Sequence, residues 1–373
     1  MSFPFLPTDP ALLKAAEITV TQSLRIQPRE RVVIITNPEP DVTEISAALY
    51  HWVREAGGIP SLVWQETKSQ LDPMDEAVRA ALLTEPDVYI SMSANKIGKD
   101  VKAVASPYTT PDGTKFDSIG AYLIHGKKCT RGFWSPGITK ALYGASVPVD
   151  FAKMKADCAW LAERLNRAVA VRVTSPGGTE ITFGTRGRKA FVDDGDFSRP
   201  GTGGNLPAGE AFLSPVMGSA EGRIVFDGSM STHKGTIFLY KPITVEYEGG
   251  FITQIAGGEE AEALAETIRL GEENAEKMEA EGKLAAGKGA VYRKNARSLG
   301  ELGIGVNPLA GITGNMIVDE KAARTCHFAV GANYDQDGPA LIHLDGLVKE
   351  PTIELELADG TNLVLMEDGL PAI

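Results

Sequence analysis

From Pro10 to about Val149 the sequence alternates between helical and strand-like apolar patterns, and this alternation is the strongest constraint on the fold. "ALLKAAEITVTQSL" has helical spacing, and "RVVIIT" is a short, continuous apolar strand. The pairs "TEISAALYHWVREAG" with "PSLVWQE" and "DEAVRAALLT" with "DVYISMS" repeat the unit. Repeated βαβ units predict a parallel sheet covered by helices on both faces. No G-x-G-x-x-G motif follows "RVVIIT", so this part is expected to be a scaffold or lid rather than a cofactor domain.

The pattern of predicted elements changes after a helix that joins the two parts, "DFAKMKADCAWLAERLNRA". Short strands follow, with hairpin-type turns at "SPGGTE" and "YEGGF", then a charged helix and a final hairpin, "PTIELELADGTNLVLMEDG". We therefore predict an α/β protein with two domains. Residues 1–150 form the parallel-sheet scaffold or lid, and residues 151–373 form an α+β domain with antiparallel strands, which is the candidate metal-binding and catalytic domain.

Composition narrows the class of protein and its partners. Of 373 residues, 43% are hydrophobic and 23% charged, as in a globular protein with a sizeable core. A net charge of -12 argues against nucleic acid and anionic membranes as partners and suits a site that attracts cations. Three cysteines are too few for a disulfide framework. With no signal peptide and no apolar run long enough to span a bilayer, a cytoplasmic protein without a membrane partner is expected.

The stretch "LIHLDG" places His343 and Asp345 two residues apart in an apolar run. If this run is a strand, both side chains point to the same face. An imidazole beside a carboxylate can be a hydrogen-bonded structural pair, an acid/base unit or two ligands of one metal ion. The spacing alone is compatible with all three.

Other polar residues occur in similarly apolar surroundings. His327 lies in "RTCHFAVG", Glu210 follows a tight turn in "GGNLPAGEAFLSPV", and Glu301 lies in "SLGELGIGVNP" without a basic neighbour. A core histidine bonded to backbone carbonyls would explain His327 alone. A buried carboxylate, however, is costly unless a cation receives it. The remaining histidines are a helix residue with a surface or boundary role and two residues in turn-like segments that are weaker candidates for a site: His51, His125 and His233.

Five of these residues form a set of oxygen and imidazole ligands without a thiolate: Glu210, Glu301, His327, His343 and Asp345. Such a mixture suits zinc, manganese, cobalt or iron(II). Three carboxylates and two histidines exceed what one catalytic zinc ion takes. A carboxylate shared between two ions, as in two-metal hydrolases, would account for the number.

The motifs "GNLPAGEAFLSPVMGSAEGRIVFDG", "LGELGIGVNP", "DEK" before "CHFAVGANY", and "IHLDG" resemble, in this order, the thermophilic metalloaminopeptidases of the aminopeptidase T and S type, which are similar to leucyl aminopeptidases. The resemblance covers most of the chain from Thr185 onward and is only architectural before it. It implies that the five residues hold two divalent ions (zinc, cobalt or manganese), that Tyr334 is catalytic, and that the protein is a homodimer. The sequence departs from the family in "EKAARTCHF", which lacks a glycine-containing turn, and in the short segment between Tyr334 and His343.

This resemblance predicts a metal-dependent aminopeptidase that removes N-terminal residues from peptides. Two ions would activate a bridging water, Glu301 would carry the proton, and Tyr334 would donate a hydrogen bond to the oxyanion. The substrate would be a peptide or small amide with a free amine. A dinuclear amidohydrolase acting on a non-peptide amide would use the same chemistry.

Two alternatives belong to other classes. The iron-dependent 2,5-dihydroxypyridine dioxygenases are similar over the same C-terminal half and share the His-x-Asp pair. In them a histidine corresponds to Glu301 and an apolar residue to Glu210, which gives one iron(II) with two histidines and one carboxylate. Because both glutamates are present here, the two-metal hydrolase is the leading prediction. The second alternative is a fold that has lost catalysis and serves as a binding or assembly module.

Overall fold

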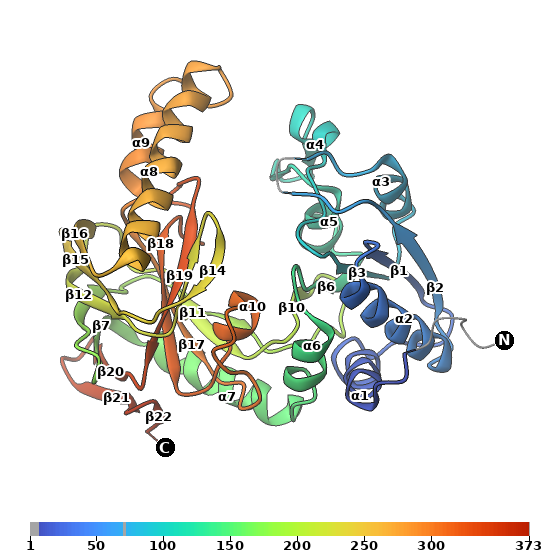
Figure 1. Cartoon of the computed structure of the whole chain (residues 1–373), viewed down its shortest axis with the longest axis horizontal. Helices are drawn as coiled ribbons and strands as arrows, with labels where there is room; N and C mark the ends of the chain where they lie inside the picture. Colours follow the sequence, from blue (N-terminus) through green and yellow to red (C-terminus); the bar gives the residue numbers. More distant parts are fainter. Residues whose placement is uncertain (1–6, 70–71, 373) are drawn as a thin grey trace. The chain divides into compact units, whose positions relative to one another are not determined.

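The computed structural model describes residues 7–69 and 72–372, and the chain divides into two compact units. The first comprises Met1–Lys155 with Asp193–Ala208, and the second Ala156–Val192 with Gly209–Ile373. In Figure 1 the first unit runs from blue to green and the second from green to red. Residues 193–208, which lie beyond the boundary predicted near residue 150, return to the first unit, so the chain passes from one unit to the other three times.

The first unit is a five-stranded parallel sheet with the order β10-β6-β3-β1-β2, as the βαβ pattern predicted. Helices α1, α2 and α6 contact one another, whereas α3 contacts α5. In chain order its elements are α1 (Pro10–Ile18), η1 (Thr19–Ser23), β1 (Arg31–Thr36), α2 (Pro40–Glu55), β2 (Ile59–Trp64), α3 (Glu76–Leu83), β3 (Val88–Met92), α4 (Val101–Ala105), β4 (Tyr108–Thr109), β5 (Lys115–Phe116), α5 (Ile119–Ala121), η2 (Tyr122–Gly126), β6 (Arg131–Trp134), α6 (Lys140–Ser146) and β10 (Gly203–Asn205).

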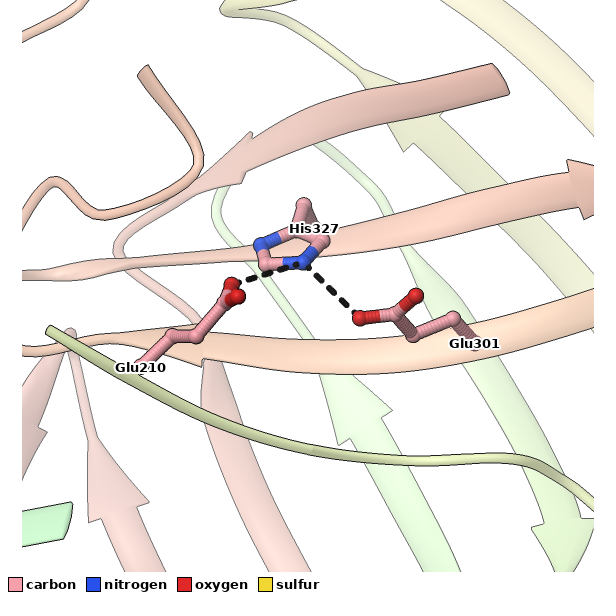
Figure 2. Close-up of side chains that lie close together, drawn as sticks. All are labelled: Glu210, Glu301 and His327. Carbon is pink, nitrogen blue, oxygen red and sulfur yellow. Dashed lines mark hydrogen bonds and ion pairs between the residues drawn. The ribbon is translucent and has the colours of Figure 1, made fainter. Parts of the chain in front are cut away.

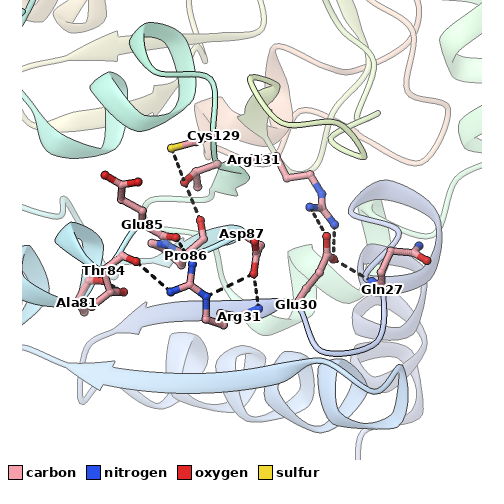
Figure 3. Close-up of polar contacts among 11 residues, drawn as sticks. Gln27, Glu30, Arg31, Ala81, Thr84, Glu85, Pro86, Asp87, Cys129 and Arg131 are labelled. Atoms are coloured by element: carbon pink, nitrogen blue, oxygen red, sulfur yellow. Dashed lines mark hydrogen bonds and ion pairs between the residues drawn. The ribbon is translucent and has the colours of Figure 1, made fainter.

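An ion pair and a backbone hydrogen bond connect the amino ends of three strands of this sheet (Figure 3). Arg131, buried at the start of β6, donates to both oxygens of Glu30 at 2.8 and 2.6 Å. At the start of β1 the backbone N–H of Arg31 donates to Asp87, which precedes β3, at 2.7 Å. The bidentate pair between Arg131 and Glu30 has a defined geometry, so these contacts help to hold the strands in register where they begin. The carboxyl ends of the same strands lie at the opposite end of the sheet.

The second unit contains two antiparallel sheets, ordered β14-β13-β19-β18-β17-β11-β9 and β16-β15-β12-β8-β7-β20-β21-β22. Helix α7 (Phe151–Leu165) leads into it. Its other elements are β7 (Ala168–Thr174), β8 (Glu180–Gly184), β9 (Phe191–Asp193), β11 (Glu210–Leu213), β12 (Glu221–Phe226), β13 (Ser229–Thr232), β14 (Gly235–Phe238), β15 (Ile243–Glu248), β16 (Phe251–Ala256), α8 (Glu259–Ala280), α9 (Lys288–Asn295), β17 (Leu299–Gly305), α10 (Met316–Asp319), β18 (Thr325–Gly331), β19 (His343–Lys349), β20 (Thr352–Leu357), β21 (Asn362–Glu367) and β22 (Leu370–Pro371).

The core of the second unit lies where these sheets meet. Phe183 of the eight-stranded sheet packs edge-on against Phe328 of the seven-stranded sheet, with ring centroids 6.2 Å apart. Leu161 and Leu165 of α7 belong to the same buried cluster. The antiparallel α+β architecture predicted for this part is confirmed, because period-two strands bury one face against the opposing sheet and against α7.

Helix α8 is the charged helix seen in the sequence, and its 22 residues place glutamates on an exposed face. Arg269 pairs on that face with Glu266 and Glu273, at the i−3 and i+4 spacings that bring side chains together on a helix. No helix within residues 7–69 and 72–372 is both long and apolar enough to cross a membrane.

Candidate metal centre

Four adjacent strands bring the five predicted ligands onto one face of the seven-stranded sheet. Glu210 begins β11, Glu301 lies on β17, His327 on β18, and His343 and Asp345 on β19. These strands are neighbours in the order β19-β18-β17-β11. Alternate residues of two of these strands point into the core instead: Leu302, Ile304, Cys326, Phe328 and Val330.

Small residues lie opposite the polar ones in the strand register. The paired positions are Gly305 with Glu210, Gly303 with His327, Gly331 with His343, and Ala329 with both Glu301 and Asp345. Because paired residues project to the same face, each small partner leaves room for a long side chain to lean across it. The alternating glycines of "ELGIGV" and the "AVG" of "HFAVG" carry this signal in the sequence, and the sequence-based prediction missed it.

Gly303 supports the most direct test of this packing. A Cβ atom at Gly303 would lie 2.0 Å from Nε2 of His327, and the backbone there is not left-handed. We expect Gly303→Ala to displace the His327 ring, to lower metal content at a fixed free metal concentration, and to cost about 1–3 kcal/mol of unfolding free energy from overpacking. Gly311→Ala is the matched control, because a Cβ there meets no atom within 4 Å. Equal metal content in both variants would contradict the packing argument.

The ligand atoms form two groups that share Glu301. In the inner group, Nε2 of His327 lies 3.4 Å from Oε2 of Glu210 and 3.3 Å from Oε1 of Glu301 (Figure 2). In the outer group, Nε2 of His343 lies 3.1 Å from Oε2 of Glu301 and 3.2 Å from Oδ1 of Asp345. Each oxygen of Glu301 therefore faces a different histidine. These separations suit neighbouring ligands of an ion bound at about 2.1 Å.

Exposure differs between the two groups. The inner residues are buried, with His327 1% and Glu301 3% exposed, whereas the side chain of His343 is 27% exposed. Nδ1 of His343 lies 2.8 Å from the carbonyl oxygen of Ala332. This contact directs Nε2 toward the carboxylates, which is the usual way that a backbone carbonyl orients a metal-binding histidine. The outer group is therefore the end of the site that a substrate can reach.

Buried polar atoms without hydrogen-bond partners indicate that the site suits a cation. Among the described residues, Oε2 of Glu210, Nδ1 of His327 and Oδ1 of Asp345 are buried without a well-aligned hydrogen bond, although the two oxygens lie 3.4 and 3.2 Å from imidazole Nε2 atoms. Leaving such atoms unsatisfied is costly, and carboxylates crowded together repel one another. A divalent ion would take up two of these orphaned oxygens, one in each group, so the donor set fits a metal.

The ionisation of the site without a metal leads to the same conclusion. Burial raises the pKa of Glu210 to about 8, against the opposing effect of Lys321. Burial alone would lower the pKa of His327, but its hydrogen bond with Glu301 and the charge of Glu210 raise it to about 9. The pKa of His343 is likewise well above its ordinary value, because Asp345 and Glu301 outweigh burial. Both imidazoles therefore carry protons at neutral pH, which a metal would replace.

Lys321 is a site residue that the sequence-based prediction missed. Its side chain is 1% exposed, and Nζ lies 2.5 Å from Oε1 of Glu210 and 2.7 Å from Oε1 of Glu320. The ammonium of Lys321 therefore compensates part of the cost of burying Glu210, so this burial does not depend on a metal ion alone. The ammonium holds one oxygen of Glu210 and leaves the other directed at His327. The motif "DEK" contains Lys321, but nothing in it distinguishes a buried lysine from a solvated one.

Tyr334 lies at the accessible end and is 50% exposed. Its ring meets that of His343 edge-on, with centroids 5.3 Å apart, and contacts Phe212 at 5.0 Å. Phe191 stacks on Phe212 at 5.4 Å, so three aromatic rings form one wall beside the outer group. Partial burial and the neighbouring carboxylates raise the pKa of the Tyr334 phenol, which therefore keeps its proton and can donate a hydrogen bond.

The remaining three histidines are on other elements of the fold. His51 is on α2 and meets the ring of Trp52 edge-on. His233, in the turn after β13, lies 2.9 Å from the hydroxyl of Thr267 through Nδ1. His125 is on η2 of the first unit. Neither metal-capable group includes any of the three.

Proteins of known structure share this fold, which combines a parallel-sheet unit with an antiparallel unit. The 2,5-dihydroxypyridine dioxygenase from Pseudomonas putida KT2440 matches with a TM-score of 0.70 and 18% identity over 98% of both chains. Wild-type AmpT from Thermus thermophilus matches with a TM-score of 0.61 and 17% identity over 97% of this chain and 99% of that one. At these identities the likeness establishes the α/β fold.

A family model described as NicX, 2,5-dihydroxypyridine 5,6-dioxygenase, matches residues 148–282. The match includes Glu210 but ends before Glu301 and the ligands that follow it, and it covers less than half of the chain. No curated protein sequence matches this chain.

These comparisons correct the leading prediction. The family match is to the dioxygenase, and the dioxygenase structure is the more similar of the two, so the assignment as an aminopeptidase, and with it the hydrolase and metallopeptidase class, was wrong. Glu210 and Glu301 favoured a two-metal hydrolase in the sequence, but metal-binding carboxylates are compatible with several chemistries and do not identify the reaction class. The prediction of metal-capable Glu and His groups is confirmed. The homodimer, the cytoplasmic location and the lack of a nucleic-acid partner stay predictions.

Proposed function

We propose that this protein is a metal-dependent dioxygenase that opens the ring of a dihydroxylated pyridine or a closely related heteroaromatic compound. The observation that carries the proposal is the outer group of Glu301, His343 and Asp345, whose donor atoms converge beside an accessible aromatic wall. The match of residues 148–282 to the NicX model supports the choice of reaction class.

The donor set differs from the two-histidine, one-carboxylate set expected for such dioxygenases, because Glu301 takes the place of a histidine. Two carboxylates and one imidazole are a harder set of ligands, which suits iron(II) or manganese(II). An iron(II) ion held by Glu301, His343 and Asp345 would supply the redox chemistry that activates dioxygen. We expect the inner group of Glu210, Glu301 and His327 to fill second, which gives two ions per chain at saturation.

The residues around the outer group would orient the substrate. The rings of Tyr334, Phe212 and Phe191 offer flat apolar surface on which a planar heteroaromatic ring can pack. The protonated phenol of Tyr334 would donate to a substrate oxygen and fix the position of the ring relative to His343. Such positioning contributes to rate by holding the reacting groups in one geometry.

The test is oxygen consumption. Protein purified without added metal is loaded anaerobically with iron(II) and mixed with 2,5-dihydroxypyridine in an oxygen-electrode cell, while ring absorbance is recorded. We expect one O₂ consumed per ring lost, because both oxygen atoms enter the product. His343→Ala should abolish uptake and His233→Ala should retain it, since the imidazole of His233 hydrogen-bonds to Thr267 and belongs to neither metal-capable group.

Two results would overturn the proposal. One is metal-loaded protein that consumes no oxygen with dihydroxypyridines, hydroxypyridine carboxylates or catechols. The other is amide-bond cleavage by the loaded protein without any oxygen uptake.

A further inference from the structure

A cavity of about 300 Å³ lies in the first unit, at the carboxyl ends of two parallel strands. Ser91 lies near the end of β3 and Trp134 ends β6, and both line it. In open parallel sheets this edge is where ligands bind, close to the point at which the strand order reverses. Here the order reverses between β1 and β3, because β2 lies on one side of β1 and the later strands on the other. The volume is at the lower end of the range for small-molecule sites.

The lining of this cavity is unusual for so acidic a chain. The protein carries a net charge of -12, yet no lining residue is an aspartate or glutamate. Its polar side chains are hydroxyls, an imidazole, an ammonium and an indole: Tyr89, Ser91, Ser93, Ser118, Lys96, His125 and Trp134. The remaining lining is largely apolar, with Ile97, Ile124 and Pro136 among it. A cavity that combines an apolar wall with hydrogen-bond donors and no carboxylate favours an uncharged or negatively charged ligand.

Lys96 carries the positive charge in the lining of the cavity. Among residues 7–69 and 72–372 no carboxylate forms an ion pair with Lys96, whereas neighbouring lysines such as Lys68 and Lys102 are paired with Asp75 and Glu76. Partial desolvation and the charge of Lys128 lower the pKa of His125, whose side chain stays partly exposed, so the imidazole is neutral at pH 7 and can form a hydrogen bond.

The hydroxyls are arranged to present donors. Ser91 and Ser93 are buried, and their Oγ atoms lie 3.0 Å apart. Burial raises the pKa of Tyr89 to about 12, so its phenol stays protonated beside Ser91. Linked hydroxyls of this kind leave at least one O–H free to turn toward a bound acceptor.

From this combination we propose that the first unit binds a small, single-ring aromatic carboxylate in the cavity. The ring lies against the indole of Trp134 and the apolar wall, and the carboxylate accepts hydrogen bonds from Lys96 and the serine hydroxyls. A cavity of about half this size is sufficient for a benzene ring in a protein interior, so a ring with one carboxylate fits the available space. The five candidate metal ligands belong to the second unit, so this site goes beyond the proposed function and does not depend on it.

The experiment is a calorimetric and tryptophan-fluorescence titration of the full chain, as purified, with nicotinate, nicotinamide and inorganic phosphate. We expect nicotinate to bind with quenching of Trp134 fluorescence, and nicotinamide and phosphate to bind at least about tenfold more weakly, since one charge-assisted hydrogen bond is worth about this factor. Lys96→Gln should weaken nicotinate about tenfold and leave nicotinamide unchanged. Trp134→Leu should weaken both and remove the quenching.

Two controls locate the ligand. Lys14→Gln makes the same change of charge on α1, where Lys14 pairs with Glu17, and should leave binding unchanged. His343→Ala should also leave the affinity for nicotinate unchanged. If nicotinate instead bound to a metal ion in the second unit, its affinity would fall in this variant. Loss of binding in His343→Ala, equal binding of nicotinamide or phosphate, or full nicotinate affinity in Lys96→Gln would each overturn the proposal, whatever the outcome of the oxygen-uptake assay.

Discussion

Glu301→Gln is expected to lower oxygen uptake by at least about 100-fold, because even the loss of an outer-shell partner of a metal ligand costs about 10–100-fold. Glu301 belongs to both metal-capable groups, with one oxygen facing His327 and the other His343. Glutamine keeps the shape but replaces one oxygen with an NH₂ group, which cannot ligate and points a donor at a histidine nitrogen. Metal content measured by mass spectrometry after dialysis should fall with the activity.

Stability distinguishes a lost ligand from a damaged fold. The metal-free Glu301→Gln protein should still fold but melt at a lower temperature than wild type, because His327 and His343 lose a carboxylate partner and compensate only in part by releasing their protons. Glu246→Gln is the matched control, since Glu246 lies on β15 of the other sheet, outside both groups. Normal metal content and oxygen uptake in Glu301→Gln would remove Glu301 from the site.

Lys321→Met is expected to be strongly destabilising in the metal-free protein. The ammonium is buried between Glu210 and Glu320, and removing one partner of a buried ion pair costs about 3–5 kcal/mol of unfolding free energy. Protonation of Glu210 should recover part of this cost. The effect is measured by urea unfolding and by native-state hydrogen exchange of β11 and β18, which report on the second unit.

A second substitution tests whether the loss comes from the uncompensated charge. Lys321→Met combined with Glu210→Gln removes both members of the pair, and it should be more stable than Lys321→Met alone. Added metal should also stabilise Lys321→Met more than wild type, since the ion would be the remaining cation beside Glu210. A loss below about 1 kcal/mol in the single variant would show that the pair contributes no more than a surface ion pair.

Much of this molecule could be predicted from local patterns. The continuous apolar run "RVVIIT" predicts a strand buried on both faces, and five of its six residues are buried in β1. The two-residue spacing of His343 and Asp345 places them on one face of β19. Both predictions succeed because helix and strand periodicity acts over a few residues.

The features that could not be predicted depend on contacts between distant parts of the chain. Lys321 and Glu210 are 111 residues apart, and no local pattern marks either as the partner of the other. Strand β10 is only three residues long and joins the first sheet beside β6, although its sequence, "GGN", has no strand propensity. The reaction class could not be predicted either, because the same carboxylates and imidazoles can hold a metal ion for oxygen chemistry or for hydrolysis.

The path of the chain has a consequence for synthesis on the ribosome. The first sheet gains its edge strand only when Gly203–Asn205 has emerged, after α7 and the first three strands of the second unit. The second unit must wait longer, because β7 pairs with β20, where Val173 is opposite Ile353. Neither unit is complete as a nascent segment, and pairings across such separations form slowly. A gene fragment that ends at residue 150 would encode the first unit without β10, and any fragment that ends before β20 would leave β7 as an open edge.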